Sequence, residues 1–215
     1  MRVTIKTIAR LTAIAALVVG SPAFAANLIL NPGFETGNLT DWLALGTGTG
    51  ASITVASGNN GPSDPGTDSA FMDNTIPANN LALQQSTALG DASPGLVNYS
   101  FDVEGNTSVN GGVLFVHVWD INSTGGVIDQ GPGLLGPYFP VTTSWTTISG
   151  SFTAPASVNH FEIEFDCTTG AAAGSAEAVD IDNVSLTQAV PEPASLSLAG
   201  LGLLGLWAHR RSRKV

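Results

Sequence analysis

Short runs of alternating apolar and polar residues fill the middle of the chain, and Gly, Asn, Asp and Pro separate one run from the next. The two-residue period is typical of half-buried strands, and no useful stretch has the 3.6-residue apolar period of a helix. Two Gly-rich segments, Gly58–Gly66 and Thr168–Ser175, are expected to be loops. The pattern predicts ten strands: Asn27–Leu30, Trp42–Leu45, Ser52–Ala56, Ser69–Met72, Leu81–Thr87, Leu96–Glu104, Val113–Asp120, Thr146–Thr153, His160–Cys167 and Val179–Leu186.

Ten short strands in this spacing predict an all-β fold, a two-sheet antiparallel β-sandwich of the jelly-roll type. The strands lie within residues 26–189, a length that fits one domain and can bury a core without cross-links. Cys167 is the only cysteine, so an intrachain disulfide is excluded. The rigidity of the fold must then come from its core or from a bound metal ion.

Two uninterrupted apolar runs lie at the ends of the chain, each beside positive charge. Basic residues at positions 2, 6 and 10 precede the first run, and Ala23 and Ala25 follow it as a small-x-small cleavage site. Residues 1–25 are therefore predicted to be a secretory signal peptide. A retained membrane anchor is the alternative, but the apolar core is short and the cleavage motif is clear.

The second apolar run, residues 194–208, carries no charge and precedes a basic cluster that contains Arg210, Arg211 and Arg213. As a helix it would span about 22 Å, less than the hydrocarbon core of about 30 Å. We therefore expect a short transmembrane helix suited to transient insertion, with the basic cluster on the cytoplasmic side.

The motif Pro191-Glu192-Pro193 stands directly before this run. The motif, the apolar run and the basic cluster together resemble a PEP-CTERM sorting signal, placed at residues 190–215. The resemblance implies transient anchoring in the inner membrane of a Gram-negative-type bacterium and processing by an exosortase-type enzyme. It also implies delivery to the cell envelope, the surface or an extracellular exopolysaccharide matrix of the biofilm kind. An ordinary single-span anchor is the alternative.

Charge is strictly segregated along the chain. All seven Lys and Arg lie in the two ends, and every acidic residue except Glu192 lies between Asn27 and Val190. Nucleic acid is excluded as a partner, because its binding needs Lys and Arg on the phosphates. A catalytic Lys or an Arg clamp is excluded as well. The acidic body favours divalent cations and disfavours anionic polysaccharides.

The start of the body, Leu28–Gly37 followed by Asp41-Trp42, resembles the opening of galactose-binding-like jelly rolls, which include carbohydrate-binding modules of bacterial glycanases. Further matching segments follow in the expected order, at residues 83–86, 99–103, 145–155 and 181–186. The resemblance implies the jelly-roll fold and a carbohydrate-binding role. With the charge pattern, it makes a neutral extracellular polysaccharide the expected partner.

The same resemblance implies a structural Ca²⁺ held by Glu35 and Asp182, since the first and last strands of that fold lie close together. Two carboxylates with backbone carbonyls of a Gly-rich turn can supply most of the oxygens that Ca²⁺ needs. Asn31 and Asp180 are weaker candidate ligands. In the alternative reading, Glu35 caps its turn and Asp182 faces water.

Three aromatic residues, Trp119, Tyr138 and Phe139, are candidates for stacking on a sugar ring, with burial in the core as the alternative. Trp42 and Trp145 follow the pattern of the resembled modules, in which they pack in the core or at a sheet edge. Sugar sites vary among those modules, so no ligand contact transfers residue by residue.

Glu162, Glu164 and Asp166 alternate with apolar residues and are expected to form the solvated face of one strand. They are not expected to form a glycosidase pair, whose carboxylates flank a cleft. No nucleophile, zinc or phosphate-loop motif is present, so we expect no enzyme. The expected function is that of an exported, non-catalytic, carbohydrate-binding protein. A structural or adhesin-like matrix protein without a glycan ligand is the alternative, and a secreted hydrolase is third.

Overall fold

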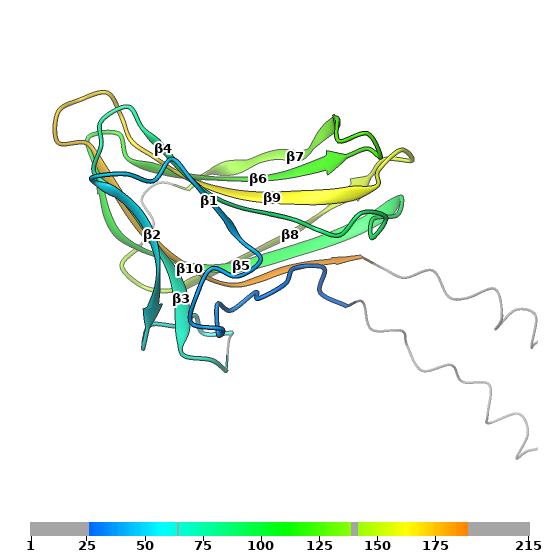
Figure 1. The fold of residues 1–215 in the computed structure, drawn as a ribbon, viewed down its shortest axis with the longest axis horizontal. Helices are drawn as coiled ribbons and strands as arrows, with labels where there is room; N and C mark the ends of the chain where they lie inside the picture. The colour runs from blue at the N-terminus through cyan, green and yellow to red at the C-terminus, as the bar shows by residue number, and fades with distance from the viewer. Residues whose placement is uncertain (1–25, 64, 139–141, 189–215) are drawn as a thin grey trace, which may run out of the picture. The chain divides into compact units, whose positions relative to one another are not determined.

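The computed structural model describes residues 26–63, 65–138 and 142–188, which form a sandwich of two antiparallel β-sheets (Figure 1). The fold class predicted from the alternating pattern is confirmed for these residues. The predicted signal peptide, the sorting tail with its apolar helix 194–208, and Phe139 lie outside the described residues. No helix in the described ranges is long and apolar enough to span a membrane.

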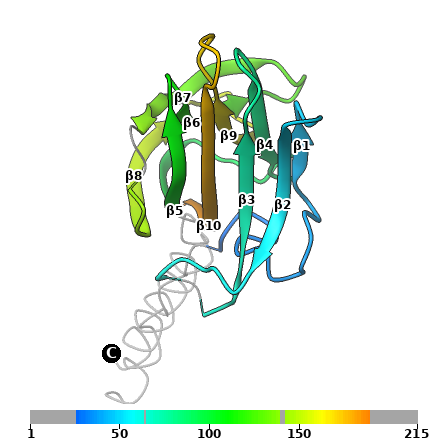
Figure 2. The same ribbon diagram turned by 90° about the vertical axis from the view of Figure 1, so that its left-hand side faces the viewer.

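Each sheet has five strands. The first sheet has the order β1-β4-β9-β6-β7, and the second has the order β2-β3-β10-β5-β8, with its strands side by side in Figure 2. The strands are β1 Leu43–Leu45, β2 Ala51–Ser57, β3 Asp68–Asn74, β4 Asn80–Ser86, β5 Gly95–Val109, β6 Val113–Ile121, β7 Val127–Tyr138, β8 Thr146–Ala154, β9 His160–Thr168 and β10 Ala176–Gln188.

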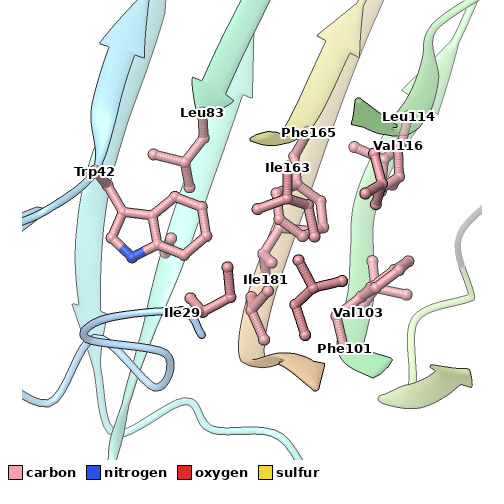
Figure 3. Close-up of a cluster of buried hydrophobic side chains, with 14 of the residues drawn as sticks. Ile29, Trp42, Leu83, Phe101, Val103, Leu114, Val116, Ile163, Phe165 and Ile181 are labelled. Atoms are coloured by element: carbon pink, nitrogen blue, oxygen red, sulfur yellow. The ribbon is translucent and has the colours of Figure 1, made fainter. Parts of the chain in front are cut away.

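The alternation in sequence determines which side chains face the space between the sheets. On β9, Phe161, Ile163 and Phe165 are fully buried in the core, and the residues between them point to the outer face. Figure 3 shows Phe165 and Phe101 meeting between the two sheets, where their rings pack edge to face with centroids 5.2 Å apart. Trp42, the residue directly before β1, packs at one side of this core and is 7% exposed. Core packing is one of the two positions expected for it from the resembled modules.

The predicted first strand, Asn27–Leu30, is wrong. Asn27 forms only an isolated bridge to Thr187 of the second sheet, and Leu28 donates its N–H to the Leu186 carbonyl. Leu30 instead exchanges hydrogen bonds with the Gln85 side chain of the first sheet. The segment therefore crosses from one sheet to the other, so it cannot continue a ladder with either.

Strand β7 was not expected, because its segment is rich in Gly and Pro. It lies at the edge of the first sheet and pairs only with β6, with register shifts along the ladder. An edge strand tolerates residues that lack an N–H or a side chain, because one side of its backbone needs no partner strand. The two predicted loops are confirmed in position, and they connect β2 to β3 and β9 to β10.

Candidate functional site

The outer face of the first sheet collects the aromatic and acidic side chains of the body. This sheet is the upper layer in Figure 1. We call this surface the carboxylate face. Its side chains come from alternate positions of β1, β4, β6 and β9: Leu43, Leu45, Ala82, Gln84, Ser86, Phe115, His117, Trp119, Glu162, Glu164 and Asp166.

Strand register arranges these side chains in rows across the sheet. Glu164 of β9 is flanked by Gln84 of β4 and His117 of β6. In the adjacent row, Glu162 lies between Ser86 and Trp119. Cross-strand neighbours of this kind have Cβ atoms about 5 Å apart, so each carboxylate is within reach of the residues beside it.

Trp119 and His117 form a stacked pair on β6. Their ring centroids are 5.1 Å apart, and their planes differ by 11°. Side chains alternate between the two faces of a strand, and the neighbouring Val116 and Val118 are fully buried in the core. His117 and Trp119 therefore point outward. Trp119 is partly exposed although His117 covers one of its faces, so the other face is the candidate surface for a sugar ring.

The three carboxylates of β9 are not a freely solvated face, which corrects the expectation from sequence. Asp166 is 5% exposed, and Glu162 and Glu164 are only partly exposed. Asn80 donates its side-chain N–H to Asp166 Oδ1 over 2.7 Å, and His117 Nε2 lies 3.3 Å from Asp166 Oδ2. The alternation was predicted correctly, but cross-strand packing buries the outward side chains.

Burial raises the pKa of Glu164 to about 7, and the negative charge of the adjacent Asp166 adds to the shift. Asp166 also shares a hydrogen bond with Glu164, and Glu162 adds a smaller repulsion. The ordinary pKa of such a carboxyl is 4.5. No Lys or Arg side chain belongs to the face, so none offsets this rise in pKa.

The candidate calcium ligands Glu35 and Asp182 contact the same loop, residues 58–67. Glu35 Oε1 accepts the backbone N–H groups of Thr67 and Asp68, each over 2.8 Å. Asp182 Oδ2 accepts the N–H of Gly61 over 2.6 Å. The structure therefore brings both carboxylates to one loop, although they lie at opposite ends of the body in sequence.

The two weaker candidates are engaged in other contacts. Asp180 accepts hydrogen bonds from the Ser69 hydroxyl over 3.0 Å and from the Asn106 side chain over 2.6 Å. Asn31 donates its amide to two carbonyls of its own loop. In the described ranges, no group of three or more His, Cys, Asp or Glu side chains has metal-binding geometry. Glu35 and Asp182 supply carboxylate oxygens, the ligand type that Ca²⁺ takes, and these oxygens accept backbone N–H groups in this structure.

The remaining predicted residues are spread over the fold. Tyr138 ends β7, where its backbone pairs with Leu114. Trp145 precedes β8 and donates its indole N–H to Asn59 of loop 58–67, so it packs near a sheet edge as expected. His117 was not predicted as part of the site. Its spacing of two residues from Trp119 on an alternating strand was the available signal.

A hollow of about 360 Å³ lies on the outer face of the second sheet. It is lined by Asn98, Tyr99, Ser100, Ser149, Gly150, Ser151, Ser185 and Thr187. None of these residues is charged, and no stacked aromatic pair in the described part of the chain lies there. The carboxylate face has the stronger means of holding a ligand, because it combines an aromatic surface with charged acceptors.

Comparison with known families places a sorting motif at the end of the chain. Residues 189–214 match the PEP-CTERM protein-sorting motif. This motif indicates an exported protein that is anchored in the membrane in transit and then sorted to the surface, and it implies processing by an exosortase. No curated protein matches the sequence.

Solved structures similar to the body are carbohydrate-binding modules and related domains. The CBM22-1 xylan-binding domain from Paenibacillus barcinonensis Xyn10C has a TM-score of 0.52 and 18% identity, over 80% of this chain and 99% of that one. A family 16 carbohydrate-binding module has a TM-score of 0.50 and 14% identity, over 75% of this chain and all (100%) of that one.

The enzymatically active domain of the bacteriophage CBA120 tailspike protein 4 has a TM-score of 0.60 and 13% identity, over 75% of this chain. The present chain spans only 21% of that protein. At these identities the similarity establishes the fold. The chain thus combines a jelly-roll domain like those of carbohydrate-binding modules with a PEP-CTERM sorting motif.

Proposed function

We propose that this protein is an exported envelope or matrix protein of a Gram-negative-type bacterium, and that its body binds an extracellular polysaccharide at the carboxylate face without catalysis. The observation that carries the proposal is the stacked Trp119–His117 pair beside a row of carboxylates on one sheet face. The carbohydrate-binding modules of similar fold support it.

The chemistry of the face suits sugar binding. The exposed face of Trp119 offers an apolar surface for the flat side of a pyranose ring, and Glu162 and Gln84 offer acceptors for hydroxyl groups. Leu43 and Leu45 extend the apolar surface along the β1 edge. Catalysis is not favoured, because the acids follow one another on a single strand, whereas glycosidase carboxylates flank the bond that is cleaved.

Substitution of Trp119 by Ala tests this proposal. The full-length protein in detergent is applied to gels that contain soluble neutral and amino polysaccharides, and retardation of the wild type identifies a ligand. Trp119→Ala should weaken binding about tenfold or more, the effect expected from loss of a buried stacking contact. Trp145→Ala is the matched control, since Trp145 lies beside the other sheet.

Two results would contradict the proposal: no retention of the wild type on any glycan, or equal retention of the Trp119→Ala variant. The first result would favour a matrix protein without a specific glycan ligand. Loss of retention in both tryptophan variants would point to a general effect on folding, which circular dichroism would reveal.

We also propose that Ca²⁺ stabilises the body through Glu35 and Asp182. Their convergence on loop 58–67 supports this role, and the absence of Lys and Arg between Asn27 and Val190 leaves a metal as the strongest available counter-charge. A bound cation would stabilise the folded state by mass action, so Ca²⁺ should raise the melting temperature above that in chelator.

Gly66 provides a sharp test of the calcium proposal. A Cβ at Gly66 would lie 2.0 Å from Glu35 Oε1, so Gly66→Ala must displace that carboxylate without removing it. The rise in melting temperature with Ca²⁺ should disappear in Gly66→Ala and in Glu35→Gln, and it should persist in Glu162→Gln, which neutralises an acid on the other sheet. An unchanged wild-type melting temperature with Ca²⁺ would refute the proposal.

A further inference from the structure

We propose that the glycan bound at the carboxylate face carries free amino groups, with a sugar ammonium seated beside Glu164. This inference rests on the function proposed above and specifies its ligand class: a cationic amino-sugar polymer. Three features of the face support it: the different partners of its three acids, the lack of Lys and Arg among its described residues, and the adjacent aromatic pair.

The three acids of β9 differ in their hydrogen-bond donors. Glu162 accepts the Ser86 hydroxyl over 2.9 Å, and Asp166 accepts the Asn80 amide and faces His117 Nε2. Glu164, the central member, has as its hydrogen-bonding neighbour another acid, Asp166. Lys and Arg are absent from the described residues of this face, so neither donates a hydrogen bond to Glu164. A cationic donor on a ligand would therefore interact most favourably with Glu164, in the middle of the row.

The described part of the chain has no Lys or Arg that could supply that cation. Between Asn27 and Val190 the sequence has no Lys or Arg, so no side chain of the body, on any strand or loop, can form an ion pair with Glu164 apart from a protonated histidine. His117 is the neighbouring histidine, and its Nε2 is directed to Asp166. A charge-complementary ligand must therefore bring its own positive charge.

The raised pKa of Glu164 is consistent with a site that lacks a positive charge. Burial and the neighbouring acids Asp166 and Glu162 raise the pKa of Glu164 to about 7. The charged and titratable groups that face it are these two acids on β9 and His117 on β6, and β4 contributes the neutral Gln84. The repulsion among these acids that contributes to the raised pKa would be relieved by a sugar ammonium bound beside Glu164.

An amino sugar fits the face better than a free metal ion does. The described residues contain no cluster of three or more acidic, His or Cys side chains with metal-binding geometry. Trp119, by contrast, stands one row from Glu164. An aromatic face attracts both the apolar side of a sugar ring and a nearby ammonium, so an amino sugar would use the two parts of the face together.

The experiment compares oligosaccharides that differ only at the amino position. Cellohexaose, N-acetylated chitohexaose and its fully deacetylated form share one backbone and carry a hydroxyl, an acetamide and an ammonium, respectively. A second acetylated and deacetylated pair with another glycosidic linkage covers a different chain geometry. Binding to the full-length protein in detergent is measured by calorimetry at low and high salt over a series of pH values from about 5 to 8, because the sugar amines are charged at the lower end of this range and Glu164 loses its proton near pH 7.

We expect the deacetylated form of at least one pair to bind about tenfold more tightly than its acetylated partner. This factor corresponds to the difference between a charge-assisted and a neutral hydrogen bond. The preference should fall at high salt, and it should be lost in Glu164→Gln, which keeps the side-chain shape. Trp119→Ala should weaken binding of all forms.

Because the whole body is acidic, a non-specific attraction for polycations must be separated from this site. Glu104→Gln is the matched control: Glu104 is a partly exposed acid on β5 of the other sheet, and its loss changes the net charge equally. Equal weakening in Glu104→Gln and Glu164→Gln would overturn the inference, as would equal affinity for the acetylated and deacetylated forms.

The outcomes also separate the inference from the proposed function. Trp119-dependent binding of a neutral or acetylated glycan without a preference for amines would leave the proposed function standing and refute the amino-sugar assignment. Absence of binding to every glycan would refute both. Amine preference that depends on both Trp119 and Glu164, but not on Glu104, would support both.

Discussion

Asp102 and Asp182 are direct cross-strand neighbours on β5 and β10, and both are fully buried. Each carboxylate accepts a backbone N–H of loop 58–67, Asp182 from Gly61 over 2.6 Å and Asp102 from Ser63 over 3.2 Å. Two adjacent acids on the outer face of a sheet are thus covered by one loop that supplies N–H donors. Backbone N–H groups thus provide the hydrogen-bond donors for these two carboxylates, in a body whose sequence has no Lys or Arg.

Asp182→Asn should destabilise the body by about 1–3 kcal/mol, the cost of a buried polar group left without its partner. Asp182 accepts backbone N–H groups at both oxygens, from Gly61 and from Asn183, so an amide NH₂ must face one of them whichever way it turns. Urea unfolding in the presence of chelator, with the slope compared between variants, measures the change.

Asp102→Asn is the matched comparison and should cost less. One of its oxygens accepts the Thr147 hydroxyl, which can rotate and become an acceptor for the new amide. Equal destabilisation by the two substitutions would contradict this account of the loop.

Stability of the body should fall as pH rises from about 4.5 to about 7. Burial raises the pKa of Glu177 from 4.5 to about 7, only partly offset by the Ser108 hydroxyl. The folded state then holds a proton that the unfolded state has released, so unfolding becomes easier across this window. The shift corresponds to about 3 kcal/mol for this side chain, which is 1% exposed.

Glu177→Gln isolates this contribution. The variant should match the wild type at pH 4, where the carboxyl is protonated in both states, and exceed its stability at pH 8. Glu164 acts in the same direction through its own raised pKa, so part of the fall should remain in the variant. Chemical unfolding at a series of pH values provides the comparison; a wild-type stability that rises between pH 5 and pH 7 would be inconsistent with these two carboxyls.

Gly46→Ala should destabilise the fold by about 2 kcal/mol or more, because it combines strain at positive φ with a steric clash. Gly46 has φ of 73°, and an added Cβ would lie 2.1 Å from the backbone carbonyl oxygen of Asn80. Gly90→Ala is the control: its φ is 87°, but nothing lies within 4 Å of the added Cβ. Its cost should be about 1 kcal/mol, from the backbone alone. Thermal melts of the two variants separate the clash from the backbone term.

Cys167 should react with thiol reagents only after the body unfolds. It is fully buried, its Sγ donates to the Glu177 carbonyl over 3.2 Å, and burial raises its pKa well above the usual range. Since the thiolate is the reactive form, the native thiol should be inert at pH 8. Labelling in increasing urea should follow the unfolding transition, and rapid labelling of the native protein would contradict the burial of this side chain.

The fold could be predicted from sequence where alternation was regular. On β9, strict alternation identified the strand and its core side, Phe161 to Phe165. Prediction from sequence failed where the structure of a segment depends on the strands that lie beside it in space. Asn27–Leu30 has strand-like residues but crosses between the sheets, and β7 has Gly and Pro that only an edge position tolerates.

The candidate site could be predicted only in part. Trp119 could be predicted as one of three candidate stacking aromatics, but its stacking on His117 and its acidic neighbours depend on side-chain packing and on the register between β6 and β9. Local alternation placed Glu164 on an outward face, yet its burial and raised pKa arise from packing across strands. The pairing of Glu35 with Asp182 was suggested by the family resemblance alone, because a relationship over such a sequence separation has no local signal.

The topology also bears on when the body can fold during export. Strand β10 is the last of the described strands along the chain, yet it is the central strand of its sheet and pairs with both β3 and β5. It also holds the start of the body, through the bridge between Asn27 and Thr187. Until residues 176–188 reach the same compartment, β3 and β5 lack their shared partner strand, and the acids of the second sheet cannot be buried against it. The body should therefore stay unfolded, and able to pass through a translocation channel, until residues 176–188 have been synthesised and moved across.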